Sequence, residues 1–246
     1  MDKERILHIN NLHKSFDDKE VIKGISLSLY SGENLVVLGK SGAGKSVVMK
    51  CIVRLMDLDD GDISVFGTDV VNCGEVELNH VRNRIGYLFQ EGAMYDSMTV
   101  SENLLFPAKR NPKLRKLSDS ELEDMVSYNL ESVGLEDARD LWPAELSGGM
   151  KKRAGLARTL MLSPEMIIYD EPTTGLDPFT GESILELIME VKEKYKTSSI
   201  IITHDIKCAK RTSDRMLIMN DGKIISEGTF NVLKASKDEN VKLFFK

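Results

Sequence analysis

The feature that most constrains the fold is a glycine-rich loop at residues 39–46, which reads Gly-Lys-Ser-Gly-Ala-Gly-Lys-Ser. The apolar run Leu35–Leu38 comes before this loop, and residues 47–53 after it can continue as a helix. A strand, a loop of the form G-x-x-x-x-G-K-S and a helix together make up the phosphate-binding P-loop. The alternative, a Gly-rich turn that binds nothing, does not explain the Lys-Ser pair. The sequence therefore predicts an α/β fold with a phosphate site at the end of a strand.

Each residue type in this loop has a chemical reason. Gly42 and Gly44 allow the backbone to approach phosphate oxygens without a side-chain clash. The N–H groups of the loop and the positive end of the following helix can then hold an anion. We expect Lys45 to reach the β- and γ-phosphates of ATP and the Ser46 hydroxyl to bind Mg²⁺. The predicted nucleotide-binding residues of the loop are Gly39, Lys40, Ser41, Gly42, Ala43, Gly44, Lys45, Ser46 and Val47.

The bulk properties of the chain exclude several classes of protein. The chain has 246 residues and a net charge of −6, whereas a nucleic-acid-binding domain is usually basic. It contains no apolar run of the roughly 20 residues that a membrane-spanning helix needs. The charged start, Met1–Arg5, lacks the apolar core of a signal peptide, and Cys51, Cys73 and Cys208 form no C-x-x-C pair. We expect a cytosolic protein with reduced thiols and no nucleic-acid partner.

Hydrophobic periodicity predicts the β-structure of the chain. Residues 1–38 contain short alternating stretches that are typical of half-buried antiparallel strands. Near-continuous apolar runs at Met166–Tyr169 and Ser199–Thr203 favour parallel strands that are buried on both faces. An Asp-Gly pair within Met216–Ile225 predicts a β-hairpin.

A different pattern separates these strands. Residues 99–140 are polar, charged and helical in period, and Ser118 offers an N-cap to one of their helices. We expect a single domain over residues 1–246, with a helical subdomain at about residues 91–160 inserted into the core. The predicted fold class is α/β: a P-loop NTPase core with a mainly parallel sheet, an N-terminal antiparallel β subdomain and the inserted helical subdomain.

Two carboxylates follow the apolar run at residues 166–169. A buried strand would bring Asp170 to the edge of the sheet, where it can hold Mg²⁺. Glu171 would emerge on the phosphate side and activate a water molecule against the γ-phosphate. The two side chains can divide these roles only if the strand ends near Asp170, as Pro172 indicates. The alternative is a pair of surface acids after a core strand.

Gln90 and His204 each follow a predicted strand of their own. The Gln90 amide can bind Mg²⁺ or the attacking water without adding charge, and the His204 imidazole can hydrogen-bond the γ-phosphate. Taken alone, Gln90 is better explained as an ordinary polar loop residue, and a lone histidine such as His204 is more often structural, so both functional roles depend on the other motifs. The predicted catalytic residues are Glu171, His204 and Gln90, and the predicted metal ligands are Ser46, Gln90 and Asp170.

A second phosphate-binding pattern lies at residues 146–150, which read Leu-Ser-Gly-Gly-Met. Met150, Ala154, Ala157 and Met161 recur at helical spacing after it, so Ser-Gly-Gly lies at a helix N-terminus. Such a terminus can bind an anion. Because one nucleotide needs only one P-loop, a second phosphate site requires an explanation.

The ordered set of motifs resembles the ATP-binding-cassette ATPase family over about residues 6–230. Within this resemblance Gln90 corresponds to the Q-loop, Asp177 to the D-loop and His204 to the switch histidine. Phe16 corresponds to the aromatic residue that stacks on adenine, although many members have Tyr there. The family implies a head-to-tail homodimer with Mg²⁺ and two ATP molecules. Each ATP would lie between the P-loop of one chain and Ser147, Gly148 and Gly149 of the other, and Asp177 would help link the two sites.

A narrower resemblance rests on two short stretches. Most family members have Gln where this chain has Met150, which continues as Lys-Lys-Arg, and residues 91–100 follow the Q-loop. Both stretches are similar to the ATPases of Mla/Mce-type phospholipid transporters, as are residues 54–61 and 240–245. This likeness implies integral-membrane permease subunits, an Mce-domain lipid-binding protein and a small cytosolic regulator as partners. It places the chain peripherally on the inner face of the cell membrane. Glu91 departs from the pattern.

Three functions remain open. The first is ATP hydrolysis that powers transport, of phospholipid or of another substrate. The second is a nucleotide-gated binding module without turnover. The third is a soluble cassette ATPase, such as a cluster-assembly subunit. Two surfaces are equally open: Met94, Tyr95 and Met98 could line a groove for a permease helix or pack the helical subdomain, and the basic residues 109–116 could face solvent or bind acidic lipid or a partner.

Overall fold

The computed structural model describes residues 4–245, so the first three residues of the predicted charged start lie outside the described residues. The chain forms two compact units. Unit 1 is Met1–Arg82 with Lys196–Lys246, and unit 2 is Asn83–Tyr195. Among the described residues, none of the helices is both long and apolar enough to cross a lipid bilayer.

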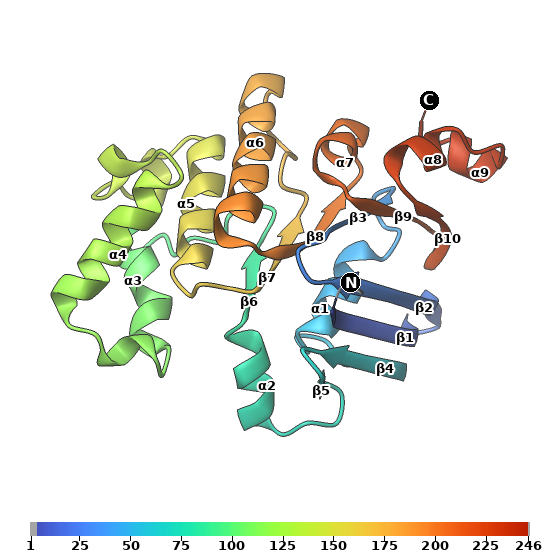
Figure 1. Cartoon of the computed structure of the whole chain (residues 1–246), viewed down its shortest axis with the longest axis horizontal. Helices are drawn as coiled ribbons and strands as arrows, with labels where there is room; N and C mark the ends of the chain where they lie inside the picture. Colours follow the sequence, from blue (N-terminus) through green and yellow to red (C-terminus); the bar gives the residue numbers. More distant parts are fainter. Residues whose placement is uncertain (1–3, 246) are drawn as a thin grey trace. The chain divides into compact units, whose positions relative to one another are not determined.

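Unit 1 contains strands of two sheets (Figure 1). One sheet is antiparallel, in the order β2-β1-β4-β5. The strands of the other run in the order β10-β9-β3-β8, with β3 parallel to both β8 and β9, and β10 antiparallel to β9. The bounds are β1 (Arg5–Phe16), β2 (Lys19–Tyr30), β3 (Asn34–Gly39), β4 (Asp60–Val65), β5 (Thr68–Asp69), β8 (Ser198–Thr203), β9 (Arg215–Asn220) and β10 (Lys223–Gly228).

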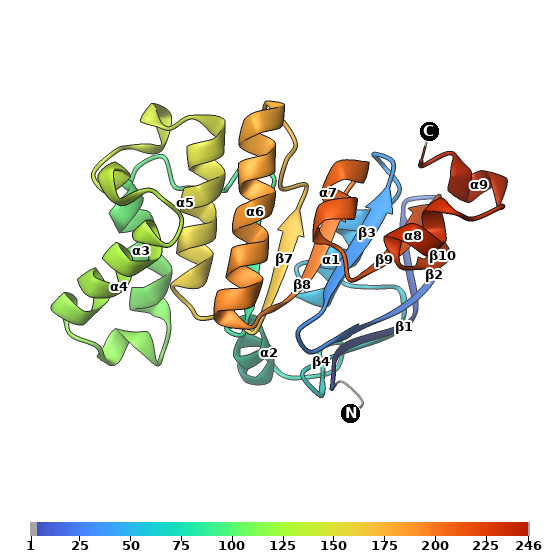
Figure 2. The same ribbon diagram turned by 45° about the horizontal axis from the view of Figure 1, so that its top comes forward.

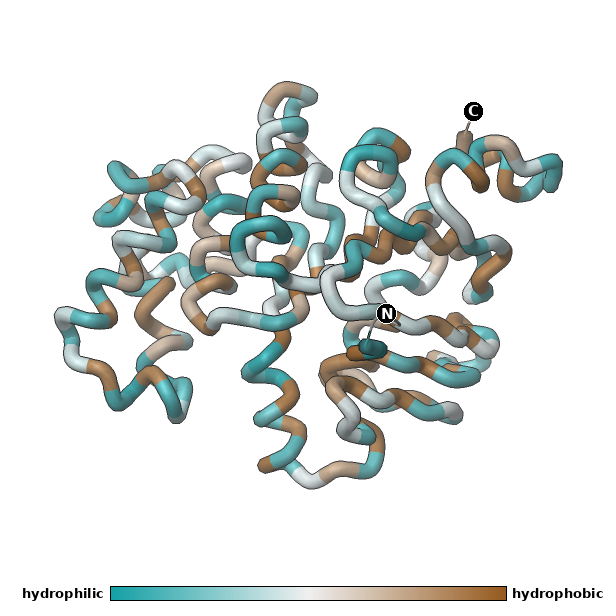
Figure 3. Tube along the Cα trace, viewed as in Figure 1, coloured by the Kyte–Doolittle hydropathy of each residue, from teal (hydrophilic) through white to brown (hydrophobic). Residues whose placement is uncertain are grey.

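The parallel strands form the core of unit 1. All residues of β3 and β8 are buried, as their continuous apolar runs predict. Helix α2 is amphipathic, and it alternates between hydrophobic and hydrophilic residues along its trace (Figure 3). The bounds are α1 (Lys45–Ile52), α2 (Glu75–Arg82), α7 (Ile206–Thr212), α8 (Phe230–Lys234) and α9 (Glu239–Lys242).

A partly buried ion pair connects the start of β9 to the turn between β2 and β3. Arg215 donates from Nε and Nη2 to the two carboxylate oxygens of Glu33, at 2.7 and 2.9 Å, and Glu33 is only 6% exposed. The carbonyl of Ser28 accepts a further bond from Arg215, at 2.6 Å. The hydrogen bond to Glu33 raises the pKa of the Arg215 guanidinium further, so the guanidinium stays charged. Forked pairs of this kind specify geometry as well as adding stability.

The predicted hairpin at residues 216–225 is confirmed. Asp221 and Gly222 connect β9 to β10, and both have positive φ, of 45° and 75°. Two positive φ values are the geometry of the tight hairpin turn that Asp-Gly favours.

Unit 2 combines a pair of parallel strands with four long helices. The strands are β6 (Ile85–Leu88) and β7 (Met166–Asp170), and the helices are α3 (Val100–Arg110), α4 (Asp119–Glu131), α5 (Gly148–Leu160) and α6 (Pro178–Tyr195). Short 3-10 turns lie at Leu114–Lys116, Glu136–Ala138 and Pro143–Glu145. Helix α5 lies beside α3, α4 and α6 (Figure 2). Ser118 caps α4 together with Glu121, as the sequence predicts.

Some elements differ from their predicted extent. Strands β1 and β2 run for 12 residues each, longer than the alternating stretches that predict them, because they pair along their whole length and absorb irregularities as bulges. Strand β4 ends at Val65, because Phe66 and Gly67 turn with φ of 50° and 80°. Helices α2 and α7 are not predicted from the sequence pattern.

Candidate functional site

The P-loop of unit 1 has the predicted strand–loop–helix geometry. Strand β3 ends at Gly39, and α1 begins at Lys45 after Gly44, which has a left-handed φ of 97°. A Cβ atom on Gly44 would lie 2.6 Å from Cδ1 of Ile22, so the position excludes a larger residue by space as well as by backbone conformation. Gly42 also has a positive φ, of 80°, and open space around it.

Lys45 lies inside this loop. Its side chain is buried, and its Nζ donates to the carbonyl oxygens of Gly39 and Lys40, at 2.7 and 3.1 Å. A Cβ atom on Gly39 would meet the carbonyl oxygen of Met219 at 2.7 Å and the Lys45 side chain at 3.2 Å. The close packing therefore fixes the ammonium group within the loop.

His204 and Phe16 also belong to unit 1. Strands β3 and β8 are parallel neighbours in which Leu38 pairs with Thr203, so Gly39 and His204 follow at the same edge of the sheet. His204 is exposed, and Asp205 after it caps α7. Phe16 is 39% exposed at the end of β1, an available aromatic face.

The two predicted carboxylates lie in unit 2, and the strand ends where their division of roles requires. Strand β7 ends at Asp170, which is 9% exposed, and Glu171 turns the chain with a φ of 50°. A left-handed backbone costs a non-glycine residue about 1 kcal/mol or more, so contacts must stabilise it. Such strained residues concentrate at functional sites.

Asp170 has a hydrogen-bonding partner that the sequence analysis did not predict. The Tyr87 hydroxyl on the neighbouring strand β6 donates to Oδ2 of Asp170, at 3.2 Å. The Tyr87 ring stacks on that of Phe89, with centroids 4.2 Å apart. Burial and the Asp170 charge raise the pKa of Tyr87, so it remains a donor at neutral pH.

Glu171 is held at both its backbone and its side chain. Thr174 donates its backbone N–H to the Glu171 carbonyl at 3.2 Å and its hydroxyl to the Glu171 carboxylate at 3.1 Å. The Nζ of Lys152, from helix α5, donates to the same carbonyl at 3.0 Å. These hydrogen bonds fix the backbone of Glu171 and so the direction in which its carboxylate projects.

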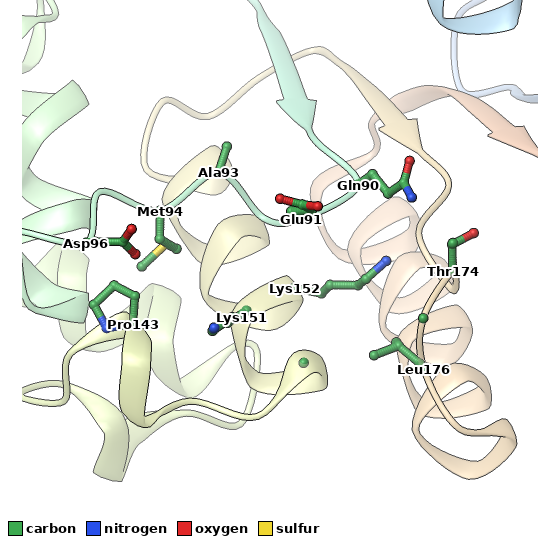
Figure 4. A pocket seen from close by; sticks show the side chains of 12 residues that line it. Gln90, Glu91, Ala93, Met94, Asp96, Pro143, Lys151, Lys152, Thr174 and Leu176 are labelled. Atoms are coloured by element: carbon green, nitrogen blue, oxygen red, sulfur yellow. The ribbon is translucent and has the colours of Figure 1, made fainter.

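Gln90 follows β6 and is exposed at the same end of the sheet as Asp170, because β6 and β7 are parallel with Leu88 opposite Tyr169. It lines a cavity of about 460 Å³ in unit 2. Lys152 and Thr174 extend into this cavity beside Gln90 (Figure 4). The cavity lining also includes Gly148 of the second phosphate-binding pattern.

That second pattern caps helix α5. The Ser147 hydroxyl accepts a hydrogen bond from the Met150 N–H at 3.2 Å, while Ser147 and Gly148 are exposed. A Cβ atom on Gly148 would lie 3.3 Å from Leu176, and one on Gly149 would clash with Thr180. We refer to residues 146–150 as the signature loop and to residues 171–180 as the Glu171 loop; the glycines bring the two loops into close packing.

Asp177 lies in the Glu171 loop directly before α6 and caps this helix. Its Oδ1 accepts from the N–H groups of Phe179 and Thr180, both at 3.1 Å. A hydrogen bond from the Thr180 side chain, together with these backbone bonds, lowers the pKa of the Asp177 carboxyl. Its position is therefore set by local backbone contacts.

The structure brings the predicted residues together in two groups. Unit 1 holds Phe16, the P-loop and His204, and unit 2 holds the remainder: Gln90, Ser147, Gly148, Gly149, Asp170, Glu171 and Asp177. The three supporting side chains of Tyr87, Lys152 and Thr174 were missed from sequence. Lys152 could have been noticed, because it falls on the buried side of the predicted helix after residues 146–150. Lysine is almost never fully buried without a partner, so its position indicates a contact.

The side chains predicted to hold Mg²⁺ carry the kind of oxygen atom that this ion takes in proteins. In unit 2 these are the Asp170 carboxylate and the Gln90 amide, and in unit 1 it is the Ser46 hydroxyl. Among residues 4–245, no three His, Cys, Asp or Glu side chains gather into a metal site of their own. Cys51 and Cys208 are buried, and burial raises the pKa of Cys51 to about 11.

Comparison with known proteins identifies the family. The family model described as "ABC transporter" matches residues 22–174. The chain is 37% identical to the probable ribonucleotide transport ATP-binding protein mkl of Mycobacterium tuberculosis over 97% of its own length, and it spans 66% of that protein. It is 35% identical to the intermembrane phospholipid transport system ATP-binding protein MlaF of Haemophilus influenzae, over 99% of this chain and 91% of the relative.

A solved structure agrees with these relatives. The structure of cbiO1 from Clostridium perfringens, part of the ABC transporter complex cbiONQ, superposes with a TM-score of 0.85 at 28% identity, over 99% of this chain and 96% of that one. The predicted fold class, a P-loop ATPase with an antiparallel N-terminal sheet and a mainly parallel sheet, is thereby confirmed. The chain belongs to the ABC transporter ATPase family and is an ATP-binding, ATP-hydrolysing transporter subunit.

Proposed function

We propose that this subunit powers the movement of phospholipid between membranes. The observation that supports this substrate is the stretch Met150–Arg153 after the signature glycines, together with similarity to a phospholipid transport ATPase over nearly the whole chain. The similarity to mkl, whose name gives a different substrate, makes another transported molecule the competing proposal. In either case the chain would be one nucleotide-binding domain with a helical subdomain at about residues 91–160.

The proposed catalytic cycle assigns a role to each site residue. Two chains bind ATP head to tail, each ATP between the P-loop of one chain and Ser147–Gly149 of the other, and Phe16 stacks on adenine. Ser46, Gln90 and Asp170 would hold Mg²⁺, which would supply positive charge against the phosphates. Glu171 activates the attacking water, and His204 donates to the γ-phosphate. The partners at the membrane are permease subunits, an Mce-domain protein and a small regulator, and the chain is peripheral on the inner face of the membrane.

A groove in unit 2 suits a short permease helix. A cavity of about 730 Å³ is lined by apolar and aromatic side chains, among them Phe89, Met94, Tyr95 and Phe106. The rings of Tyr95 and Phe106 lie 4.6 Å apart and form one wall. Such a groove takes the apolar face of an amphipathic helix. Met98, also expected there, is not among the lining residues; its carbonyl accepts from Asn103.

Two arginines give this groove a charge preference. Arg110 lies over the Phe106 ring at 3.5 Å, and Arg158 donates to the carbonyls of Ala93 and Gly92 at 2.6 and 3.3 Å. Both guanidinium groups line the cavity. We therefore expect the docked helix to combine apolar anchors with an acidic residue.

The Met94→Glu variant should test the groove. A carboxylate on its apolar wall would have to be desolvated when a helix docks, so we expect loss of the permease from the complex and loss of ATP-driven transport. The ATPase activity of the isolated subunit should survive. Co-purification with the permease and ATPase assays of the isolated subunit measure the two effects.

Val76→Glu is the matched control for this variant. Val76 is 74% exposed on α2 in unit 1, so the same charge is added to open surface. Complexes of normal composition with Met94→Glu would contradict the groove proposal, whereas loss of the permease in both variants would indicate a general effect of charge.

Tyr87→Phe should weaken Mg²⁺ binding. The change removes the hydroxyl that orients Asp170 and leaves the aromatic stack with Phe89 intact. Loss of an outer partner of a metal ligand weakens metal affinity by about tenfold or more, so the half-saturating Mg²⁺ concentration for hydrolysis should rise by about that factor. Tyr128→Phe, on the exposed face of α4, is the control. An unchanged Mg²⁺ titration in Tyr87→Phe would contradict the assignment of Asp170 as a Mg²⁺ ligand.

The substrate is tested by purifying the subunit from detergent-solubilised membranes and identifying bound proteins and lipids by mass spectrometry. A permease, an Mce-domain protein and co-purified phospholipid would support phospholipid transport. Recovery of a permease without an Mce-domain protein or phospholipid would support a role as a transporter ATPase and would contradict phospholipid as the transported substrate. Absence of any membrane protein would favour a soluble cassette ATPase such as a cluster-assembly subunit.

A further inference from the structure

The backbone of Glu171 needs support that its own segment supplies only in part. Its φ of 50° is a left-handed conformation that glutamate rarely adopts. Thr174 supplies two local hydrogen bonds, one to the carbonyl and one to the carboxylate. Both come from the same short loop, so they cannot by themselves fix that loop relative to a neighbouring element.

Lys152 supplies the contact from outside the loop. It lies in the second turn of α5 and is 5% exposed, and its Nζ donates to the Glu171 carbonyl at 3.0 Å. A buried ammonium group is expensive unless it makes strong hydrogen bonds. Figure 4 shows the Lys152 side chain extended away from α5 toward Thr174 and Gln90, whereas the Lys151 side chain points elsewhere.

The signature loop and the Glu171 loop also pack too closely to move independently. The Cβ positions of Gly148 and Gly149 are limited by Leu176 and Thr180, both on the Glu171 loop. Because close-packed interiors transmit displacements, a shift of the N-terminus of α5 changes the position of this loop.

We propose that Lys152 is a positioning residue for Glu171. Its ammonium group fixes the Glu171 carbonyl, and through it the left-handed backbone that directs the carboxylate, so the direction of this carboxylate depends on the placement of helix α5. Since the signature loop begins α5, a phosphate bound at Ser147–Gly149 acts on Glu171 of the same chain through Lys152. The inference rests on the proposed role of Glu171 in activating water.

Lys152→Met tests the proposal, because it keeps the length of the side chain and removes the donor. Misplacement of a catalytic group by about 1 Å costs up to about 100-fold, so we expect kcat to fall by about 10- to 100-fold while KM for ATP stays within about twofold. Lys152→Arg, which restores a long cationic donor, should recover most of kcat. Lys151→Met is the matched control, with the same charge removed one residue away, and should keep its kcat.

A second readout does not depend on activity. Lys152→Met should speed hydrogen exchange of the backbone amides in residues 171–176, including the Thr174 N–H that bonds Glu171, while the amides of α6 keep their protection. Adding Lys152→Met to Glu171→Gln should lower the residual rate no further, since both changes remove the same function.

The outcomes separate the two hypotheses. Normal kcat in Lys152→Met together with strongly reduced turnover in Glu171→Gln would overturn the role of Lys152 and keep that of Glu171. A folded Lys152→Arg variant as slow as Lys152→Met, or unchanged exchange at residues 171–176, would also overturn it. Normal turnover in Glu171→Gln would refute the role of Glu171 and this inference with it.

Discussion

Glu171→Gln is expected to reduce steady-state ATP hydrolysis by about 100- to 10,000-fold, the usual contribution of a general base. The amide has nearly the shape of the carboxylate, so the hydrogen bond from the Thr174 hydroxyl and the bonds to the Glu171 carbonyl can persist. The change therefore removes proton acceptance and leaves ATP binding in place. Phosphate release by the purified subunit measures the effect.

The same variant should accumulate as an ATP-bound dimer, because ATP favours closure and hydrolysis is needed to reopen it. Size-exclusion chromatography with and without ATP would detect the dimer. The single tryptophan of the chain, Trp142, precedes the signature loop and is 46% exposed, so its fluorescence should change when a second chain covers that loop. Glu186→Gln, on the exposed side of α6, is a matched control. Hydrolysis at the normal rate in Glu171→Gln would contradict the role of Glu171 as the general base.

Lys45→Met is expected to weaken ATP binding by about 10- to 100-fold, in line with the loss of charge-assisted hydrogen bonds to phosphate. Hydrolysis should fall at least as far, since the same ammonium group stabilises charge that develops on the phosphates. Methionine keeps the unbranched side chain that packs against Gly39 within the loop. Direct titration of ATP binding and the initial rate of hydrolysis measure the two effects.

Lys50→Met is the control for this variant, because Lys50 lies on the exposed side of the same helix α1. Removing a charge there tests whether the net charge of α1 matters for binding an anion. Equal losses of ATP affinity in Lys45→Met and Lys50→Met would refute a specific contact between Lys45 and phosphate.

Lys45→Met and Glu171→Gln should differ in ATP binding and dimerisation, and this difference separates the residue that binds ATP from the residue that hydrolyses it. Lys45→Met should bind ATP poorly and therefore fail to dimerise with it, whereas Glu171→Gln should bind ATP and dimerise without turnover. A pair of variants with the same behaviour would mean that binding and hydrolysis are not assigned to separate residues as proposed.

Local sequence patterns predicted the elements that local physics controls. The P-loop was predictable because Gly44 and Lys45 are required by backbone geometry and phosphate chemistry whatever packs around them. Helix α4 was predictable because Ser118 and Glu121 cap it through their own backbone. The end of β7 at Asp170 was predictable from the apolar run and Pro172.

Contacts between distant segments were not predictable in this way. Tyr87 and Asp170 are 83 positions apart, and their hydrogen bond exists because β6 pairs with β7. The full length of β1 and β2 depends on their mutual pairing, which the alternating stretches alone did not reveal. Periodicity identifies which face of an element is buried, and it does not identify the element that covers that face.

The sequence by itself determined the family of this protein, because the P-loop, the signature loop and the carboxylates Asp170 and Glu171 occur in it as an ordered set. Only the tertiary structure decided how those groups are held. It gave Glu171 its left-handed backbone, placed Lys152 of α5 against its carbonyl and set Tyr87 against Asp170. The physical reason is that a motif specifies the groups that react, whereas their direction depends on packing between segments far apart in the chain.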